Sequence, residues 1–317
     1  MRTLTLTLLL ALLGEPHLVE YAIPTAGANP HCLVAAPDGM IWFAEFSGNK
    51  LGRFDPGTQK FTEWPVPTAN AHPHGITTAS DGRLYFTEQA GNKVAAFDPK
   101  TERFTEFPVP SANAGPHTPI QGPDGAIWFT EQSGNRIGRL DRQSGQITEV
   151  PVPTPHANAY GIISAPAERA LYFAELEGHK LGRIDVASKQ IVEYATPTPQ
   201  SGVRRLAIDR QGGIWMTYFV AGKVARFDPA TKTFKEYDAP GGKDGGPYSI
   251  EVDSTGLIWF NEFAKNDLVE LDPATGKMTT YAIPSGPALV RKMTVDARNT
   301  VWYANFGQSK IGKVVRE

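Results

Sequence analysis

Seven pairs of large apolar residues, each led by Trp or Tyr, recur along the chain at a spacing of 43 or 44 residues. The pairs are Trp42-Phe43, Tyr85-Phe86, Trp128-Phe129, Tyr172-Phe173, Trp215-Met216, Trp259-Phe260 and Trp302-Tyr303. Between them lie short alternating runs separated by Gly, Asp, Asn and Pro, and helical periodicity is nowhere convincing. A repeat of this length and pattern is typical of a four-stranded propeller blade. The sequence therefore predicts an all-β fold, a seven-bladed β-propeller whose aromatic pairs pack between blades.

The second repeat shows where the four strands of a blade are expected. Residues 74–79 read as the innermost strand, 83–88 as the second, 93–98 as the third and 103–109 as the outermost. Asp81-Gly82 suits the tight turn between the first two strands, and Gly91-Asn92 suits the next turn. Pro108 lies at the end of the outermost strand, an edge position where the missing backbone donor is tolerated.

The outermost strand of the seventh blade is absent from the C-terminal end of the repeat array. The turn between the third and fourth strands occurs six times, and a seventh copy would begin where the sequence ends, at "KIGKVVRE". Residues 17–24, "HLVEYAIP", have the pattern of the outer strands "KFTEWPVP" and "KMTTYAIP". We therefore expect the N-terminal strand to complete the seventh blade and close the ring.

Composition and charge narrow the choice of partners and of location. The net charge is −2 and Lys and Arg are scattered singly, which argues against nucleic acid and against an anionic membrane as partners. Residues 1–14 resemble a secretory signal, so we expect a secreted or periplasmic protein, with a cytoplasmic location as the alternative. Residues 15–317 are expected to form a single propeller domain. A closed ring has no sheet edge that must pair, which predicts a monomer.

Two positions of the repeat carry chemically versatile side chains. The first series, about eleven residues before each aromatic pair, is His31, His74, His117, Tyr160, Arg204, Tyr248 and Arg291. The second series, three residues after the first member of each pair, is Glu45, Glu88, Glu131, Glu175, Tyr218, Glu262 and Asn305. In an antiparallel hairpin each histidine lies opposite or beside the glutamate of its own repeat. Because the innermost strands line the channel, we expect both series to meet at one mouth of it, the default place for a functional site.

The repeat from Pro73 to Pro110 resembles that of the streptogramin B (virginiamycin B) lyases, and the resemblance extends from about residue 17 to the C-terminus. It implies a seven-bladed propeller that uses Mg²⁺ to open a cyclic depsipeptide antibiotic by elimination. In that family the chemistry uses a Pro-His at the start of the sixth repeat, and a Glu-Pro-His and a second-strand Glu in the seventh. Here those places hold Tyr248, the Leu-Val-Arg of residues 289–291, and Asn305. Pro-His occurs instead in the first three repeats, as "NPHC", "HPHG" and "GPHT".

One hypothesis is that the same constellation lies two blades away in the ring. The catalytic candidates are then His74, as the base that removes a proton beside the ester, and His31, with Glu88 orienting His74. Glu45, Glu88 and Glu131 are the candidate Mg²⁺ ligands, because this cation prefers carboxylate oxygens. The candidates for contacting a small molecule or cyclic peptide at the channel mouth are His117, Tyr160, Arg204, Tyr248 and Arg291.

Two other functions stay open at this point, so whether the protein is an enzyme is undecided. The first alternative to a lyase is a non-enzymatic exported propeller that binds a peptide, glycan or anion through Arg204, Arg291 and the histidines. The third possibility is a metal-dependent lactone hydrolase of the gluconolactonase kind, although those propellers have six blades and seven are counted here.

Overall fold

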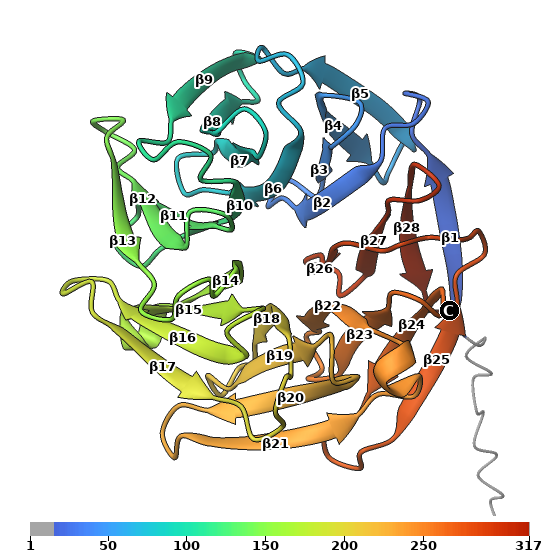
Figure 1. Cartoon of the computed structure of the whole chain (residues 1–317). Coiled ribbons are helices and arrows are strands. Elements are labelled where there is room, and N and C mark those ends of the chain that lie inside the picture. The colour runs from blue at the N-terminus through green and yellow to red at the C-terminus, as the bar shows by residue number, and fades with distance from the viewer. Residues whose placement is uncertain (1–15, 317) are drawn as a thin grey trace, which may run out of the picture.

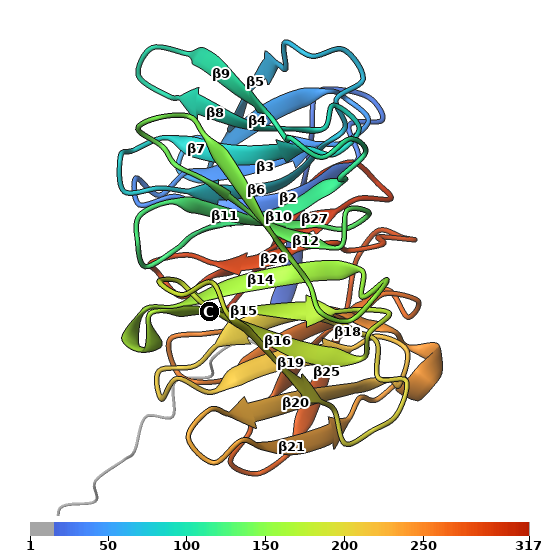
Figure 2. The ribbon, with the colours of Figure 1, turned by 60° about the vertical axis from the view of Figure 1, so that its left-hand side comes forward.

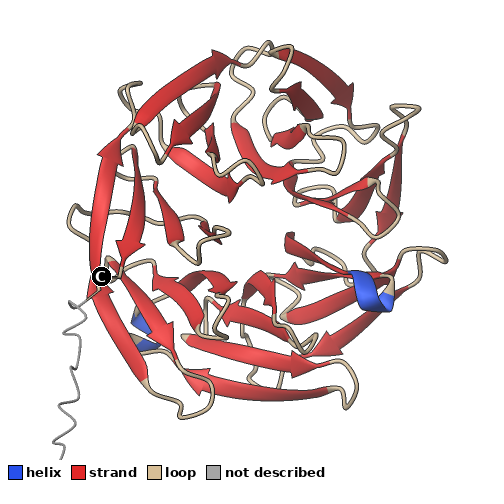
Figure 3. Cartoon of the chain, turned by 180° about the vertical axis from the view of Figure 1, so that it is seen from behind, coloured by secondary structure: helices blue, strands red, loops and turns tan. Residues whose placement is uncertain are grey.

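The computed structural model of the chain describes residues 16–316, which form seven four-stranded antiparallel sheets around one axis (Figure 1). Strands and loops account for nearly all of this part, and two short 3-10 turns, η1 (Pro166–Glu168) and η2 (Gly242–Asp244), interrupt the loops (Figure 3). Within residues 16–316 no helix is long and apolar enough to cross a membrane. The predicted seven-bladed propeller is therefore confirmed. The signal-like segment 1–14 lies outside the described residues.

Each blade contributes four strands from the channel outward, and the outermost strands, such as β9 and β21, lie at the periphery (Figure 2). The innermost strands are β2 (Pro30–Ala35), β6 (Pro73–Thr78), β10 (Pro116–Gln121), β14 (Ala159–Ala165), β18 (Val203–Ile208), β22 (Pro247–Val252) and β26 (Met293–Val295). The second strands are β3 (Ile41–Glu45), β7 (Leu84–Glu88), β11 (Ile127–Glu131), β15 (Ala170–Glu175), β19 (Ile214–Tyr218), β23 (Ile258–Glu262) and β27 (Val301–Asn305). The third strands are β4 (Lys50–Asp55), β8 (Lys93–Asp98), β12 (Arg136–Leu140), β16 (Lys180–Asp185), β20 (Lys223–Asp228), β24 (Asp267–Leu271) and β28 (Lys310–Val315). The outermost strands are β5 (Lys60–Pro65), β9 (Arg103–Pro108), β13 (Ile147–Pro151), β17 (Ile191–Ala195), β21 (Thr233–Asp238), β25 (Met278–Ala282) and β1 (His17–Ala22).

The ring closes through the N-terminal strand, as predicted. β1 pairs antiparallel with β28 from His17 opposite Val315 to Ala22 opposite Lys310, so the seventh blade joins both ends of the described chain (Figure 1). Glu20 fixes this strand in place, because its carboxylate accepts hydrogen bonds from Asn305 Nδ2 at 2.7 Å and from Ser285 Oγ at 2.5 Å. Closure brings the first and the seventh innermost strands side by side at the channel.

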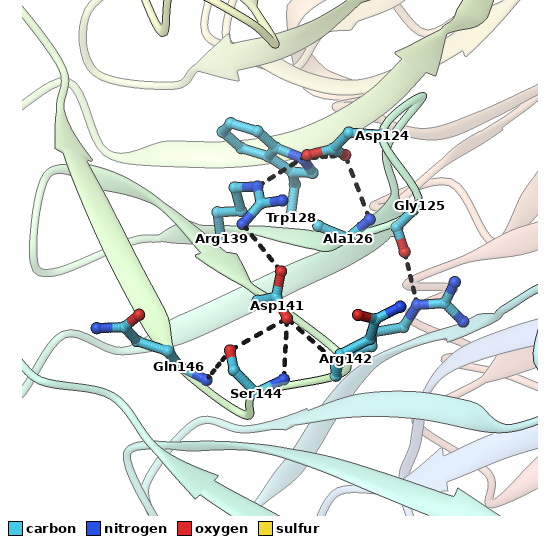
Figure 4. A network of polar contacts seen from close by, with 10 residues as sticks. Asp124, Gly125, Ala126, Trp128, Arg139, Asp141, Arg142, Ser144 and Gln146 are labelled. Atoms are coloured by element: carbon cyan, nitrogen blue, oxygen red, sulfur yellow. Dashed lines mark hydrogen bonds and ion pairs between the residues drawn. The ribbon is translucent and has the colours of Figure 1, made fainter.

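The repeated aromatic residues form the packing between and within blades. Phe43 of β3 packs against Gly52 of β4, where a Cβ would lie only 2.2 Å from the Phe43 ring. Trp128 is fully buried, and its indole Nε1 donates a hydrogen bond to Asp124 at 3.0 Å (Figure 4). Asp124 also forms an ion pair with Arg139 at 2.8 Å. The Asp of the first turn in this blade therefore satisfies the polar atom of the buried Trp.

Candidate functional site

The first series of variable residues lies at one end of the channel because each innermost strand begins there. Six of them are the second residue of their strand, and Arg291 lies just before β26. In the first six blades the pairing with the second strand shifts register across this position, for example between Pro30 and Leu33, on either side of His31. We call the seven residues the mouth residues; they are His31, His74, His117, Tyr160, Arg204, Tyr248 and Arg291.

The three histidines form a stack of rings in the order of their blades. Ring centres are 3.6 Å apart for His31 and His74, 3.9 Å for His74 and His117, and 4.0 Å for His117 and Tyr160. All three histidines are buried, and His74 is only 2% exposed. Burial, reinforced by nearby positive groups such as Arg205, lowers the pKa of each imidazole well below its usual value. The stack is therefore neutral at neutral pH.

Two tyrosines and two arginines fill the other half of the mouth. The phenol oxygens of Tyr160 and Tyr248 are 2.5 Å apart. Arg204 Nη2 donates to the Tyr160 oxygen at 2.8 Å, and Arg291 Nη1 donates to the Tyr248 oxygen at 3.3 Å. Burial by itself would raise the pKa of Tyr248, but the charges of Arg204, Arg205 and Arg291 outweigh it and lower this pKa to about 8. The arginines thus make this half of the mouth electropositive, and they surround Tyr248, whose phenol has a lowered pKa.

A half-ring of phenylalanines that was not predicted from the sequence borders the mouth; three of its members contact the arginines, and Phe46 contacts the histidines. The residue directly after the second strand is Phe46, Phe219, Phe263 and Phe306 in the first, fifth, sixth and seventh blades. These four blades are neighbours in the ring, and the four side chains are half-buried. The guanidinium of Arg204 lies 4.3 Å from the Phe219 ring centre, and that of Arg291 lies 4.8 Å from Phe263 and from Phe306. The sequence did contain a signal for this half-ring, because the residue directly after the second strand differs between repeats, as the mouth residues do.

The predicted glutamates do not join the mouth residues. The register is close to the one predicted, with Glu88 opposite Pro73, one residue from His74. The side chain of Glu88 nevertheless has Glu106 and Lys93, on the outer strands of its own blade, as its neighbours, and His74 Nδ1 lies 3.3 Å from the carbonyl oxygen of His117 instead. Among the described residues, no hydrogen bond or ion pair joins a carboxylate to any mouth residue. Orientation of His74 by Glu88 is therefore not observed.

Glu45 and Glu131 behave in the same way as Glu88. Burial, together with the carboxyl groups of Glu63 and Glu149 on the outermost strands, raises the pKa of both to about 8, and burial with Glu106 raises that of Glu88 to about 7. Glu175 repeats the arrangement in the fourth blade. Each carboxyl has its charged neighbours within its own blade, so these glutamates do not converge on a common metal site.

Threonines of the second strands instead position three of the mouth residues, His117, Tyr160 and Tyr248. Thr87 Oγ1 donates to the carbonyl oxygen of His117 at 2.7 Å and accepts from the Gly75 backbone at 3.0 Å. Thr130 and Thr217 make the corresponding bonds to the carbonyl oxygens of Tyr160 and Tyr248. A Cβ at Gly75 would lie 2.2 Å from the same His117 oxygen, so the two blades approach each other closely here. The mouth is thus held by bonds from blade to blade.

The donor groups of the mouth do not fit Mg²⁺, which takes oxygen ligands and keeps several waters. The mouth supplies neutral imidazoles, phenols and guanidinium groups, and the last repel a cation. Within residues 16–316 the group with metal-binding spacing is His31, Cys32 and His74, whose nitrogen and sulfur atoms lie within 4.8 Å of one another. That set suits a softer metal, but Arg205 Nη2 is 3.5 Å from Cys32 Sγ and adds positive charge there.

Comparison with known proteins gave one family and several close folds. The sequence model described as "Virginiamycin B lyase family" matches residues 12–118 and 59–317. A streptogramin B lyase structure superposes with a TM-score of 0.89 at 27% identity, covering 95% of this chain and 98% of that one. Virginiamycin B lyase from Staphylococcus aureus gives a TM-score of 0.88 at 28% identity, covering 95% and 99%. A catalytically inactive histidine-to-alanine variant of that enzyme, solved with quinupristin, gives 0.88 at 27% identity, with the same coverage. Comparison with curated proteins gave no match.

Proposed function

The chain belongs to the virginiamycin B lyase family, and we propose that it binds a carboxylate-bearing ligand at the channel mouth through Arg204 and Arg291. One observation carries this proposal. Both arginines are partly exposed, both face Tyr248, and neither has an acidic partner among the described residues. Their Nε atoms are buried and find no hydrogen-bond partner within residues 16–316.

Arg204 and Arg291 have no acidic partner among the described residues and are partly shielded from water, so the site favours an anion. Removing a charge from water without a counter-charge is unfavourable, and a carboxylate that accepts from both arginines relieves it through charge-assisted hydrogen bonds. The half-buried phenylalanines beside the arginines offer an apolar surface next to the guanidinium groups. The ligand class that matches both features is a carboxylate attached to an aromatic or aliphatic body.

The distribution of exposure favours binding over catalysis. A general base must reach the proton it removes at hydrogen-bonding distance. His74 is 2% exposed between two other rings, and Tyr248 is 0% exposed beneath the arginines. His74 and Tyr248, which could transfer a proton, are therefore less exposed than Arg204 and Arg291, which could hold a ligand.

Binding is tested by calorimetric titration with N-acetyl-L-phenylalanine and with its uncharged amide. We expect the acid to bind at least about tenfold more tightly than the amide, because one charge-assisted contact contributes on that scale. Arg204→Gln and Arg291→Gln should each remove most of this difference. Arg103→Gln, on the exposed outer strand β9, is the matched control and should keep it. Equal affinity for acid and amide in the wild type would overturn the proposal.

Depsipeptide elimination is the second candidate, and membership of the lyase family is the observation that favours it. It is tested by incubating the full chain with quinupristin and following the products by chromatography and mass spectrometry. Ring opening by elimination leaves the mass unchanged and creates a C=C bond, whereas hydrolysis by a lactonase adds one water. Our proposal predicts that the cyclic peptide is recovered intact. A ring-opened product of unchanged mass would replace the binding function with the lyase, and one heavier by a water would replace it with the hydrolase.

A further inference from the structure

A cavity of about 310 Å³ lies in the channel beneath the mouth residues and is lined by the innermost strands. We infer that this cavity is a second binding site, for the carboxylate of a small amphiphile with an aliphatic body, entered from the channel end opposite to the mouth. It is independent of the proposed function, because its lining does not include Arg204, Arg291 or any other mouth residue.

The position of the entrance follows from the exposure of the lining residues. Cys32 and Arg205, at the start of their strands, are buried. Val34, Ile120 and Ile208, further along their strands, are partly exposed. The cavity is therefore closed toward the stacked histidines and open toward the far end of the channel. A ligand enters there and places its head group near Arg205.

The walls of the cavity are mostly aliphatic, which selects the body of the ligand. Leu33, Ile76, Pro119, Ile162 and Leu206 all line it. Aliphatic walls favour an apolar ligand body because its burial removes hydrocarbon surface from water. A volume of a few hundred Å³ is within the range of small-molecule sites.

Arg205 selects the head group. Its side chain is 2% exposed; Nη1 donates to Thr118 Oγ1 at 2.9 Å, and Nη2 lies 3.5 Å from Cys32 Sγ. Its Nε has no partner in the part of the chain that the structure describes. No acidic side chain pairs with it among the described residues. The other charged lining residues, Lys292 and Glu251, form an ion pair with each other. Arg205 is thus the one uncompensated charge of the lining, and a single carboxylate balances it.

Cys32 gives a direct readout, because it is the only cysteine of the chain and lines the closed end of the cavity. The experiment measures the rate at which iodoacetamide alkylates the native full chain, with and without octanoate, and with octanol as the uncharged probe. We expect saturating octanoate to slow alkylation about tenfold or more, and octanol at the same concentration to have little effect. Arg205→Gln should remove the protection by octanoate, whereas Arg103→Gln should retain it.

A second measurement covers the case in which Cys32 reacts too slowly or Arg205→Gln fails to fold. Calorimetric titration of the wild type should show binding of octanoate at least about tenfold tighter than that of octanol. Arg205→Lys keeps the charge but loses the planar fork, and should weaken octanoate binding while leaving octanol binding unchanged. Equal effects of octanoate and octanol on alkylation, or equal affinities in the titration, would overturn the inference. So would the absence of octanoate binding.

Discussion

At the scale of single residues, Tyr248 couples ligand binding to pH. Its pKa, lowered to about 8 by the surrounding arginines, means that a phenolate forms among them just above neutral pH. That phenolate competes with a ligand carboxylate for Arg204 and Arg291. We predict that the affinity for N-acetyl-L-phenylalanine falls between pH 7 and pH 9, and that Tyr248→Phe largely removes the fall. The measurement is calorimetry across this range, and a fall of the same size in both proteins would contradict the assignment.

The buried glutamates produce a second pH effect, on stability. The pKa of Glu45 is about 8 in the folded chain against an ordinary value of 4.5, so between these limits the folded state binds more protons than the unfolded state. Stability from this group is present at low pH and is lost as pH rises toward 8. The stacked histidines, with lowered pKa values, act in the opposite direction only below about pH 6.5.

We therefore predict that the melting temperature falls from pH 6.5 to 8.5. Glu45→Gln should reduce the fall, because the amide imitates the protonated carboxyl group. The control is Glu102→Gln, since Glu102 is exposed and the equivalent place in the first repeat is already Gln59. Thermal unfolding at the two pH values checks this, and a slope unchanged by Glu45→Gln would refute it.

At the scale of strands, the threonine bonds between blades set the positions of the mouth residues. Thr87→Val keeps the shape of the side chain but leaves the Gly75 amide and the His117 carbonyl without their shared partner. We expect a loss of about 1–3 kcal/mol in the free energy of unfolding, measured with urea. Thr105→Val on exposed β9 should change it by less than about 0.5 kcal/mol. If Thr87→Val and Thr105→Val changed the free energy of unfolding equally, the hydrogen bonds of Thr87 between blades would contribute no stability of their own.

The hairpins also show how far the sequence could predict the site. Turn residues and alternation were enough to predict which strand pairs with which, and they put Glu88 within one residue of His74. The register shift after Pro73 was not predicted, because Gly75 marks it in this blade but Cys32, Thr118 and Arg205 occupy the same place in others. The direction of the glutamate side chains, toward Glu63 and Glu106 rather than the channel, depends on packing that alternation alone does not describe.

At the scale of the whole molecule, the count of repeats predicted both the number of blades and closure by β1. The chemistry of the mouth could not be predicted in the same way. Whether Arg204 and Arg291 have acidic partners depends on contacts between blades that are far apart along the chain. The phenylalanine half-ring has the same origin, because Phe46 meets Phe306 only after the ring has closed.

Closure itself is testable with a matched pair of substitutions. Tyr21 of β1 packs against Phe54 with ring centres 4.6 Å apart, and Tyr194 of β17 packs against Phe227 at 4.7 Å. If β1 is held as firmly as an internal outer strand, Tyr21→Ala and Tyr194→Ala should each lower the free energy of unfolding by about 2–3 kcal/mol. Urea unfolding measures both, and a negligible effect of Tyr21→Ala alone would show that the terminal strand does not close the ring.

Anion binding at the mouth is the central claim, and the position of a bound carboxylate tests it most directly. Crystals soaked with 4-bromobenzoate locate the ligand through the anomalous scattering of bromine. We predict the carboxylate between Arg204 and Arg291, with the ring against Phe219 or Phe263. Bromine found only elsewhere, or absent from the mouth at a concentration that saturates the protein in solution, would contradict the account.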